Sequence, residues 1–581
     1  MIVRWNIRNG LVPVIIAGLL VLCSASAAAQ ELVVERDLKV PMPDGAMLMT
    51  DVYRPTGEDP LPVVFVRTPY VKDQFGWFGQ ALAAHGGYAV VIQDMRGQVE
   101  SEGQFQPFTN ERGDGLASLD WIAEQPWCDG NIGMWGSSYL SYAALLLATE
   151  NHSALKTVIN ISGWGNPDTM GAPGGAMHLM LALPWTLSRQ IHGERDRIDY
   201  DEIFALTPVS RIPELAGIES PAWAGYFEEE EDEGGFETSE SMAGRYGNVD
   251  IPIMHIVGWN DFLATSTLEV YEGIREAQGD SAPFQKLIVT PLAHDMQWDT
   301  ASVVGDEDFG PESTLGGQRL IEMSIVWFHR YLRDIPTGVD QEPPVRIFLM
   351  GANEWRELDE WPPAADETTW WLESAGSANT RDGDGMLLKT DAATPGHDTF
   401  IYDPMDPVPT HGGANIHFFP DRLGPRDQRE IEDREDVLCY TSAPLESDLD
   451  IVGRIEATIY AATEGRSTDF TAKLVAVRPD GYARIVTEGI KRDADVPEGE
   501  EYTPMTPGRV YPVTIDMGAT AIRVPKGHQL RLEISSSNFP KYTRNPNTGE
   551  AAELAEEFVP VTQTVYHDEE HASVLRLPVL R

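Results

Sequence analysis

One serine in the sequence stands in a setting that makes a hydroxyl nucleophilic. Ser138 lies in the run Gly-Met-Trp-Gly-Ser-Ser-Tyr-Leu-Ser at residues 133–141, where a short apolar strand pattern gives way to a helical one. A nucleophile elbow needs this junction, because a sharp turn lifts the hydroxyl above the edge of a sheet and small neighbours relieve the crowding. Gly136 fits the Gly-x-Ser-x-Gly pattern, whereas Leu140 and Ser141 depart from it. The run indicates an acyl-transfer nucleophile, with a small-residue turn that carries no chemistry as the alternative.

A serine hydroxyl needs a base to remove its proton and a carboxylate to orient that base. In folds with this elbow, the acid and then the histidine follow the serine along the chain. Asp261 follows the apolar run 251–257, and His294 follows the run 287–290, so both stand at predicted strand ends. A helix N-cap at Asp261 and a structural histidine at position 294 are the alternatives.

The elements that must position these residues alternate in type. Apolar, β-branched runs predict strands at residues 33–40, 47–53, 61–66, 88–92, 132–135, 157–161, 251–257 and 287–290. Helical stretches are predicted at residues 78–85, 115–123, 139–148, 265–277 and 317–332. Such alternation predicts an α/β fold with a mostly parallel sheet that is covered on both faces.

Two regions interrupt this alternation. Residues 163–247 are rich in Met, Leu and Trp and then turn acidic, which predicts a helical cap inserted between two core strands. After Pro343 and Pro344, short strands such as 345–349 follow one another without helices, which predicts a β-sandwich. The expected architecture is an α/β-hydrolase core over residues 30–162 and 248–340, the cap over 163–247, and a C-terminal jelly-roll β-sandwich domain over 341–581.

Composition narrows the partners and the compartment. The formal net charge of −48 argues against binding to nucleic acid or to anionic membranes, which attract basic surfaces. Residues 1–29 have the basic start, the apolar run and the small-residue end of a signal peptide, which predicts a periplasmic or secreted protein with no membrane contact after cleavage. The alternative is that this segment is not cleaved and stays as an N-terminal membrane anchor. The acidic run 228–233 predicts a solvated loop, with cation binding as the weaker interpretation. No residues show metal-ligand spacing, so no metal and no cofactor are expected.

Several motifs together resemble one family. The elbow resembles that of the family containing X-prolyl dipeptidyl-peptidases, bacterial cocaine esterase and α-amino-acid ester hydrolases, with Ser141 in place of a glycine. Gly-Trp-Asn-Asp at 258–261 resembles the family's Gly-Trp-x-Asp motif, and His294 keeps its spacing from the preceding proline, although Thr290 and Leu292 depart from the usual residues. Further matches follow in order along nearly the whole chain, at residues 67–70, 93–97, 126–130, 173–176, 344–351, 468–474 and 535–546.

The resemblance implies roles for individual residues. It implies a catalytic triad of Ser138, Asp261 and His294. The backbone N–H of Tyr139, directly after the nucleophile, is expected to donate to the oxyanion of the tetrahedral intermediate. By resemblance the phenol of Tyr70 is the second donor, with a buried structural tyrosine as the alternative. The candidates to line the substrate pocket, with core packing as the alternative, are Trp164, Trp185 and Trp259.

These roles predict a serine hydrolase that cleaves an acyl ester or amide of a small molecule or a short peptide through an acyl-enzyme. Family members that bind a free α-amino group carry carboxylates just after the catalytic aspartate, whereas Leu263 and Ala264 are apolar here. This favours an esterase or acylase over an X-prolyl dipeptidyl-peptidase, although Asp168 in the cap is a substitute carboxylate. A catalytically inactive, exported binding protein is the remaining alternative. The oligomeric state stays open, with a homo-oligomer among the alternatives.

Overall fold

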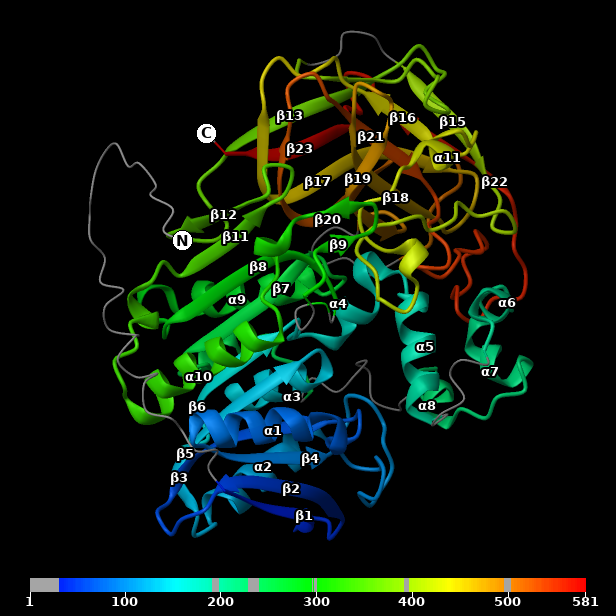
Figure 1. The fold of residues 1–581 in the computed structure, drawn as a ribbon. Helices are drawn as coiled ribbons and strands as arrows, with labels where there is room; N and C mark the ends of the chain where they lie inside the picture. Colours follow the sequence, from blue (N-terminus) through cyan, green and yellow to red (C-terminus); the bar gives the residue numbers. More distant parts are fainter. Residues whose placement is uncertain are drawn as a thin grey trace, which may run out of the picture.

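A computed structural model describes residues 31–190, 198–227, 240–294, 296, 300–390, 396–495 and 503–580 (Figure 1). The predicted signal peptide at 1–29 and the acidic run at 228–233 lie outside the described residues. Within the described part, two large sheets dominate the fold, and helices gather around the first of them (Figure 1).

The first sheet has ten strands in the described part of the chain. Their order across the sheet is β1 (Leu32–Pro41), β2 (Met47–Pro55), β4 (Ala89–Asp94), β3 (Leu61–Thr68), β5 (Cys128–Ser137), β6 (Leu155–Ile161), β7 (Ile253–Asn260), β8 (Gln285–Ala293), β11 (Val345–Leu349) and β12 (Glu354–Leu358). Neighbours from β4 to β11 pair in parallel, and the outer pairs are antiparallel. The parallel strands are continuous apolar runs because helices cover both of their faces.

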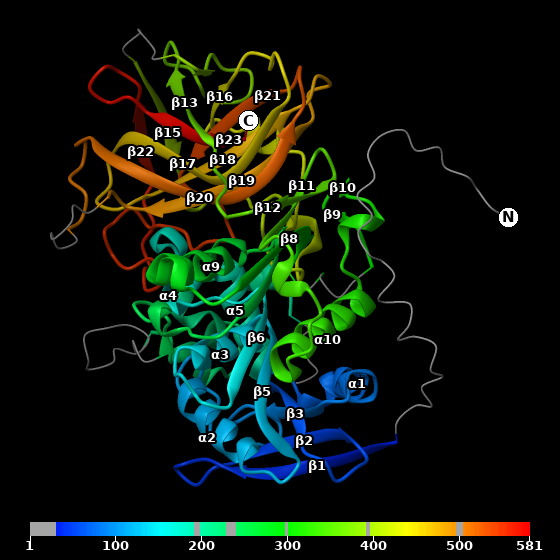
Figure 2. The ribbon, with the colours of Figure 1, turned by 90° about the vertical axis from the view of Figure 1, so that its left-hand side faces the viewer.

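Helices pack on both faces of this sheet (Figure 2). The first face carries α2 (Glu111–Ala123), α3 (Tyr139–Ala148) and α9 (Ala264–Gln278), whose apolar side chains share one core with the strands. The second face carries α1 (Gly76–Ala81) and α10 (Gly317–Arg333), which share another core. The carboxyl ends of the parallel strands therefore meet at one edge, where the polar residues that follow them can converge.

Between β6 and β7 the described residues form helices and turns. The helices are α4 (Pro167–Gly171), α5 (Leu179–Gln190), α6 (Tyr200–Phe204), α7 (Ile212–Leu215) and α8 (Pro221–Ala224). They enclose a small core of their own, and Phe419 and Phe539 from the later part of the chain pack against it. This helical region therefore packs against loops of the C-terminal part of the chain.

The second sheet connects eleven strands in the described part of the chain. They are β13 (Asp366–Glu373), β14 (Met386–Leu388), β15 (His397–Tyr402), β16 (Leu438–Thr441), β17 (Leu449–Thr463), β18 (Asp469–Val477), β19 (Ala483–Arg492), β20 (Tyr511–Val524), β21 (Gln529–Ser535), β22 (Val561–Tyr566) and β23 (Val574–Val579). One apolar core joins Val257 and Phe348 of the first sheet to Leu474 and Leu532 of the second. The two parts of the chain are thus packed together through a shared interior.

The first sheet continues past the predicted domain boundary. The sequence assigned the strand at 345–349 to the C-terminal sandwich, but β11 pairs in parallel with β8, with Val345 opposite Leu287. Four of its five residues, Val-Arg-Ile-Phe-Leu, are buried, as in a strand covered on both faces. The first sheet therefore extends beyond the predicted boundary at residue 340 and ends at β12.

The described part of the chain also answers two questions, about membrane-spanning helices and about the cysteines. No helix there combines the length and the apolar character needed to cross a membrane. Cys128 is half-buried and Cys439 is buried, and both are free thiols.

Candidate active site

Ser138 stands on a strained turn between β5 and α3. Its backbone has φ 58° and ψ −127°, a conformation that only a tightly packed site maintains in a serine. A Cβ at Gly136 would lie 2.4 Å from the backbone of Leu140, so only glycine fits there. The hydroxyl of Ser141 donates to the Gly136 carbonyl at 2.6 Å and accepts from the Ile161 amide at 2.8 Å. The serine that departs from the family pattern thus holds the turn together.

The residues that follow β7 and β8 meet this serine. His294 Nε2 lies 3.1 Å from Ser138 Oγ, and His294 Nδ1 lies 3.0 and 3.1 Å from the two oxygens of Asp261. Asp261 is fully buried, and its carboxylate also accepts the Leu263 N–H at 2.9 Å. The two ring nitrogens therefore have different partners, so the carboxylate can orient the ring while the other nitrogen faces the hydroxyl.

Two donors expected to face an oxyanion flank Ser138. Tyr139 is the first residue of α3, so its backbone N–H has no acceptor within the helix. Tyr70 lines the same cavity as Ser138 and His294, and its hydroxyl accepts a hydrogen bond from Trp185 Nε1 at 3.1 Å. The guanidinium of Arg189 lies 4.6 Å from the centre of the Tyr70 ring. A positive charge at this position favours negative charge that develops beside the phenol.

Ser138 and His294 open into a cavity of about 700 Å³. Trp164 and Trp185, two of the three tryptophans that the sequence offered as pocket candidates, line this cavity. Trp164 stacks on Tyr142 with ring centres 5.2 Å apart, and Trp185 stacks on Tyr139 at 5.4 Å. The wall is mostly aromatic and aliphatic, and Asp168 is also among the lining residues. Such a cavity suits an apolar acyl group of drug-like size.

The C-terminal part of the chain supplies one wall that the sequence did not predict. Ile416, His417, Phe418 and Glu553 line the cavity although they lie far from Ser138 in sequence. No periodicity or motif links them to the elbow, since only the packing of the second sheet on the first brings them there. Phe262 was also missed; its ring lies 4.6 Å from that of His294 and shields the imidazole.

Trp259 does not line this cavity, contrary to the prediction from sequence. Its indole donates to the Phe348 carbonyl at 2.8 Å, and its ring lies 5.5 Å from that of Trp361. The residue is buried in the core that joins the two sheets. Side chains alternate between the two faces of a strand, so residues two positions apart point to the same face. Trp259 would therefore point to the same face as Asp261 only if the strand stayed regular to its end. The strand has an irregularity at Gly258–Asn260, where the pairing with β8 shifts.

The site combines a parallel sheet, a serine on a strand–helix turn, and a histidine and a carboxylate after later strands. This combination defines a serine hydrolase with a mixed α/β core. The comparisons with known proteins agree. The family model of X-Pro dipeptidyl-peptidase (S15 family) matches residues 44–295, and that of the X-Pro dipeptidyl-peptidase C-terminal non-catalytic domain matches residues 337–576. Cocaine esterase of Rhodococcus sp. (strain MB1 Bresler) is 35% identical, with 94% of this chain and 99% of the esterase covered. The chain belongs to this family of serine esterases and X-Pro dipeptidyl-peptidases.

Solved structures share the fold. An aminopeptidase from the marine sediment archaeon Thaumarchaeota archaeon superposes with a TM-score of 0.80 at 22% identity, covering 100% of this chain and 99% of that one. An α-amino acid ester hydrolase gives a TM-score of 0.80 at 23% identity, with 96% and 98% covered. At these identities the likeness establishes the fold alone.

Proposed function

We propose that the chain hydrolyses acyl esters or amides through an acyl-enzyme on Ser138, with Asp261 and His294 completing a catalytic triad. The observation that carries the proposal is the single imidazole between two partners, 3.1 Å from the hydroxyl and 3.0 Å from the carboxylate. That distance is within the reach required for a base and its nucleophile.

In the first half of the reaction, Ser138 Oγ attacks the carbonyl carbon while its proton passes to His294 Nε2. The carbonyl oxygen becomes an oxyanion, which accepts hydrogen bonds from the Tyr139 amide and the Tyr70 hydroxyl. Collapse of the intermediate breaks the bond to the leaving group, which takes the proton from His294. The acyl group stays on the serine oxygen as an ester.

In the second half, water enters the place of the leaving group. His294 takes a proton from the water as its oxygen attacks the acyl carbon, and the second tetrahedral intermediate forms in the same oxyanion hole. Its collapse releases the carboxylic acid and returns the proton to Ser138 Oγ. Asp261 stabilises the imidazolium in both halves and keeps its own negative charge.

The nucleophile is tested with Ser138→Ala and an aryl ester such as p-nitrophenyl benzoate. We expect kcat to fall by several orders of magnitude, on the order of 10⁶-fold. A fluorophosphonate probe should label the wild type at Ser138 and leave the variant unlabelled. Ser374→Ala, which removes a buried hydroxyl among the C-terminal strands, is the matched control and should label normally. An unlabelled wild type would leave the inactive binding protein as the better interpretation.

The mostly apolar cavity wall supports an esterase or acylase with an apolar acyl group as the first choice. Asp168 on the same wall favours a second candidate, an aminopeptidase-like or X-prolyl dipeptidyl-peptidase activity in which the carboxylate pairs with a free α-amino group. Ala-Pro and Gly-Pro arylamides are compared with simple aryl esters in the wild type and in Asp168→Asn. Higher kcat/KM for the arylamides, lost in the variant, would establish the peptidase; similar ester rates in both proteins support the esterase.

Three further features complete the proposal. We propose the domain division expected from sequence, with the first sheet extended through β12, and a jelly roll for the remaining strands. Export of the protein through the signal at 1–29 rests on sequence alone. N-terminal sequencing of protein recovered from the periplasm or medium tests it, and an intact N-terminus would contradict it.

A further inference from the structure

A buried carboxylate lies directly behind the candidate oxyanion hole. Glu111 is the first residue of α2 and is 4% exposed. Its Oε1 accepts a hydrogen bond from the Tyr139 hydroxyl at 2.5 Å, and its Oε2 accepts the backbone N–H groups of Thr109 and Asn110, each at 3.1 Å. The carboxylate thus has donors at both oxygens, which is the condition for keeping a charge in the interior.

Tyr139 is the residue whose backbone N–H faces the oxyanion in the proposed mechanism. Its phenol is fixed from two sides, because it donates to Glu111 and accepts the Phe108 N–H at 2.9 Å. A hydrogen bond that fixes the side chain of the first residue in a helix also fixes the helix start. The direction of the Tyr139 amide therefore depends on a contact on the far side of its own ring.

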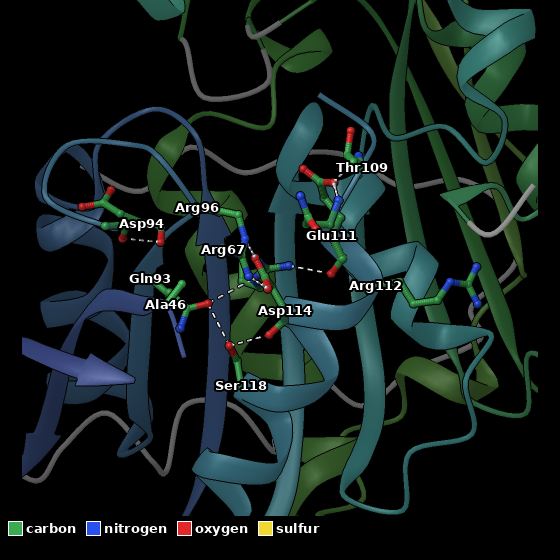
Figure 3. Close-up of polar contacts among 12 residues, drawn as sticks. Ala46, Arg67, Gln93, Asp94, Arg96, Thr109, Glu111, Arg112, Asp114 and Ser118 are labelled. Atoms are coloured by element: carbon green, nitrogen blue, oxygen red, sulfur yellow. Dashed lines mark hydrogen bonds and ion pairs between the residues drawn. The ribbon is translucent and has the colours of Figure 1, made fainter. Parts of the chain in front are cut away.

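The same glutamate is connected to the strand that precedes the second donor. Arg67 lies near the end of β3, three residues before Tyr70, and is 1% exposed. Its Nη1 donates to the Glu111 carbonyl at 2.7 Å and its Nε to Gln93 Oε1 at 3.1 Å (Figure 3). Tyr70 is then held to this strand end by the bond from its own amide to Thr68 Oγ1 at 2.9 Å.

On the cavity side, Trp185 contacts both tyrosines. Its ring stacks on Tyr139 and its indole donates to the Tyr70 hydroxyl. Tyr70 and Tyr139 are therefore linked in front by a tryptophan of the cap and behind by Arg67 and Glu111.

Electrostatics makes the rear link rigid. Burial raises the pKa of Glu111, while the Tyr139 hydrogen bond and the Arg67 charge oppose that rise. Burial also lowers the pKa of Arg67, against the attraction of Asp114 and Glu111. Because a buried polar group that leaves its hydrogen-bond partners is costly, rotation of either side chain away from this group carries a penalty. The group holds one geometry.

We infer that Glu111 is a positioning residue of the oxyanion hole, which holds the Tyr139 amide and, through Arg67, the strand end bearing Tyr70 at one fixed separation. The inference rests on the proposed function. Its consequence is that loss of the Glu111–Tyr139 bond weakens binding of the tetrahedral intermediate and leaves binding of the flat substrate intact.

The test uses two variants of the full-length chain, Tyr139→Phe and Glu111→Gln. Tyr139→Phe removes one hydroxyl and keeps the ring stacking and the backbone amide. We expect kcat for an aryl ester to fall about tenfold to a hundredfold, with KM little changed. An aryl trifluoromethyl ketone forms a tetrahedral adduct when Ser138 Oγ adds to its carbonyl carbon. Its affinity should fall by the same factor as kcat/KM, while the affinity for benzoate, a flat product, stays unchanged.

Ser118→Ala is the matched control. Ser118 Oγ belongs to the same polar group and donates to Gln93 Oε1 at 2.9 Å (Figure 3). Among the described residues its hydrogen bonds go to Gln93 and Asp114, not to Tyr139 or Glu111. This variant should lose stability and keep the wild-type kcat and ketone affinity. The comparison separates damage to the buried group in general from damage to the oxyanion hole.

The inference is overturned if Tyr139→Phe keeps the wild-type kcat and ketone affinity, or if ketone and benzoate affinities fall together. Should Glu111→Gln fail to fold, Tyr139→Phe decides alone, because it leaves the carboxylate and its other donors in place. Failure of the proposed function gives a different result: wild-type protein would show neither ester hydrolysis nor labelling of Ser138. An active wild type with an unaffected Tyr139→Phe refutes the positioning role only.

Discussion

Within the residues that the structure describes, two clusters of a serine, a histidine and an aspartate lie in different parts of the fold. The first is Ser138, His294 and Asp261 at the edge of the first sheet. The second lies among the C-terminal strands, where Ser374 follows β13, Asp398 lies in β15 and His567 follows β22. In the second cluster the hydroxyl lies 3.0 Å from the histidine Nε2 and 2.7 Å from the nearer carboxylate oxygen, so all three groups are in contact.

The two clusters differ in which histidine ring nitrogen faces the serine hydroxyl and which faces the carboxylate. His294 uses Nδ1 for the carboxylate and Nε2 for the hydroxyl, whereas His567 turns Nε2 to both Ser374 and Asp398. The Nδ1 of His567 is buried without a hydrogen-bond partner among the described residues. In a catalytic triad, the carboxylate holds one ring nitrogen while the opposite nitrogen takes the proton of the serine hydroxyl. His567 turns a single nitrogen to both groups, so it cannot act in this way.

Access separates the clusters as well. Ser138 opens into the large cavity, whereas Ser374, Asp398 and His567 are at most 3% exposed and none of them lines that cavity. The Asp398 carboxylate also accepts from the Tyr440 hydroxyl at 2.8 Å and the Ala378 amide at 2.9 Å, so it works as a junction for several strands. In the proposed mechanism the first cluster therefore serves chemistry, whereas the burial and the contacts of the second indicate a role in the stability of the sheet.

The sharpest test of this contrast changes the same atom in both clusters. Asp261→Asn should lower kcat by about 10⁴-fold, because the amide cannot hold the imidazole in the required tautomer. Asp398→Asn should leave kcat unchanged and reduce the free energy of unfolding by about 3 kcal/mol, because several buried donors lose a charged acceptor. Ester kinetics and urea unfolding on both variants measure the two effects. A kinetic loss in Asp398→Asn of the size seen in Asp261→Asn would remove the distinction.

The tyrosines beside each cluster give a second, smaller contrast. Tyr70→Phe should slow ester hydrolysis by about a hundredfold, since one oxyanion donor is lost. Tyr440→Phe removes the hydroxyl that donates to Asp398 and should cost about 1 kcal/mol of stability with normal kinetics. Steady-state kinetics and thermal unfolding of the two variants provide the measurement. An unchanged kcat in Tyr70→Phe would mean that another group completes the hole.

Much of the first cluster was predictable because its residues follow the order of the strands. Ser138, Asp261 and His294 each follow an apolar run, and the carboxyl ends of parallel strands meet at one edge. No such rule led to the second cluster, whose serine and histidine lie 193 positions apart and follow strands with antiparallel neighbours.

The remaining misses have the same physical cause. The Glu111–Tyr139 bond joins a helix start to the elbow across 28 positions, and neither residue type is unusual in its local pattern. The cavity wall around His417 and Phe418 depends on how the two sheets pack, which local periodicity does not encode. Trp259 carried a correct motif, but its ring direction was set by the irregular end of β7.

The smallest expected effect concerns acid stability and distinguishes a structural carboxylate from a catalytic one. Burial alone would raise the pKa of Asp398, but hydrogen bonds from His567, Ser374, Ala378 and Tyr440 outweigh burial and hold the pKa below its ordinary value of 3.8. A depressed folded-state pKa gives stability that is present above pH 3.8 and is lost as the pH falls through the folded-state value, because the unfolded chain then binds the proton first.

Asp398→Asn has no proton to bind at this position, so its unfolding free energy lacks this contribution at every pH. The difference in unfolding free energy between wild type and variant should therefore be constant from about pH 5 to 8 and shrink below about pH 4. Urea unfolding at pH 7, 5, 4 and 3 measures it, with Asp382→Asn, which changes an exposed carboxylate in a turn, as the charge-matched control. A difference in unfolding free energy that grows as the pH falls would show that the folded sheet does not stabilise the ionised form of Asp398. The contacts of this cluster could then not be explained as donors gathered around a negative charge.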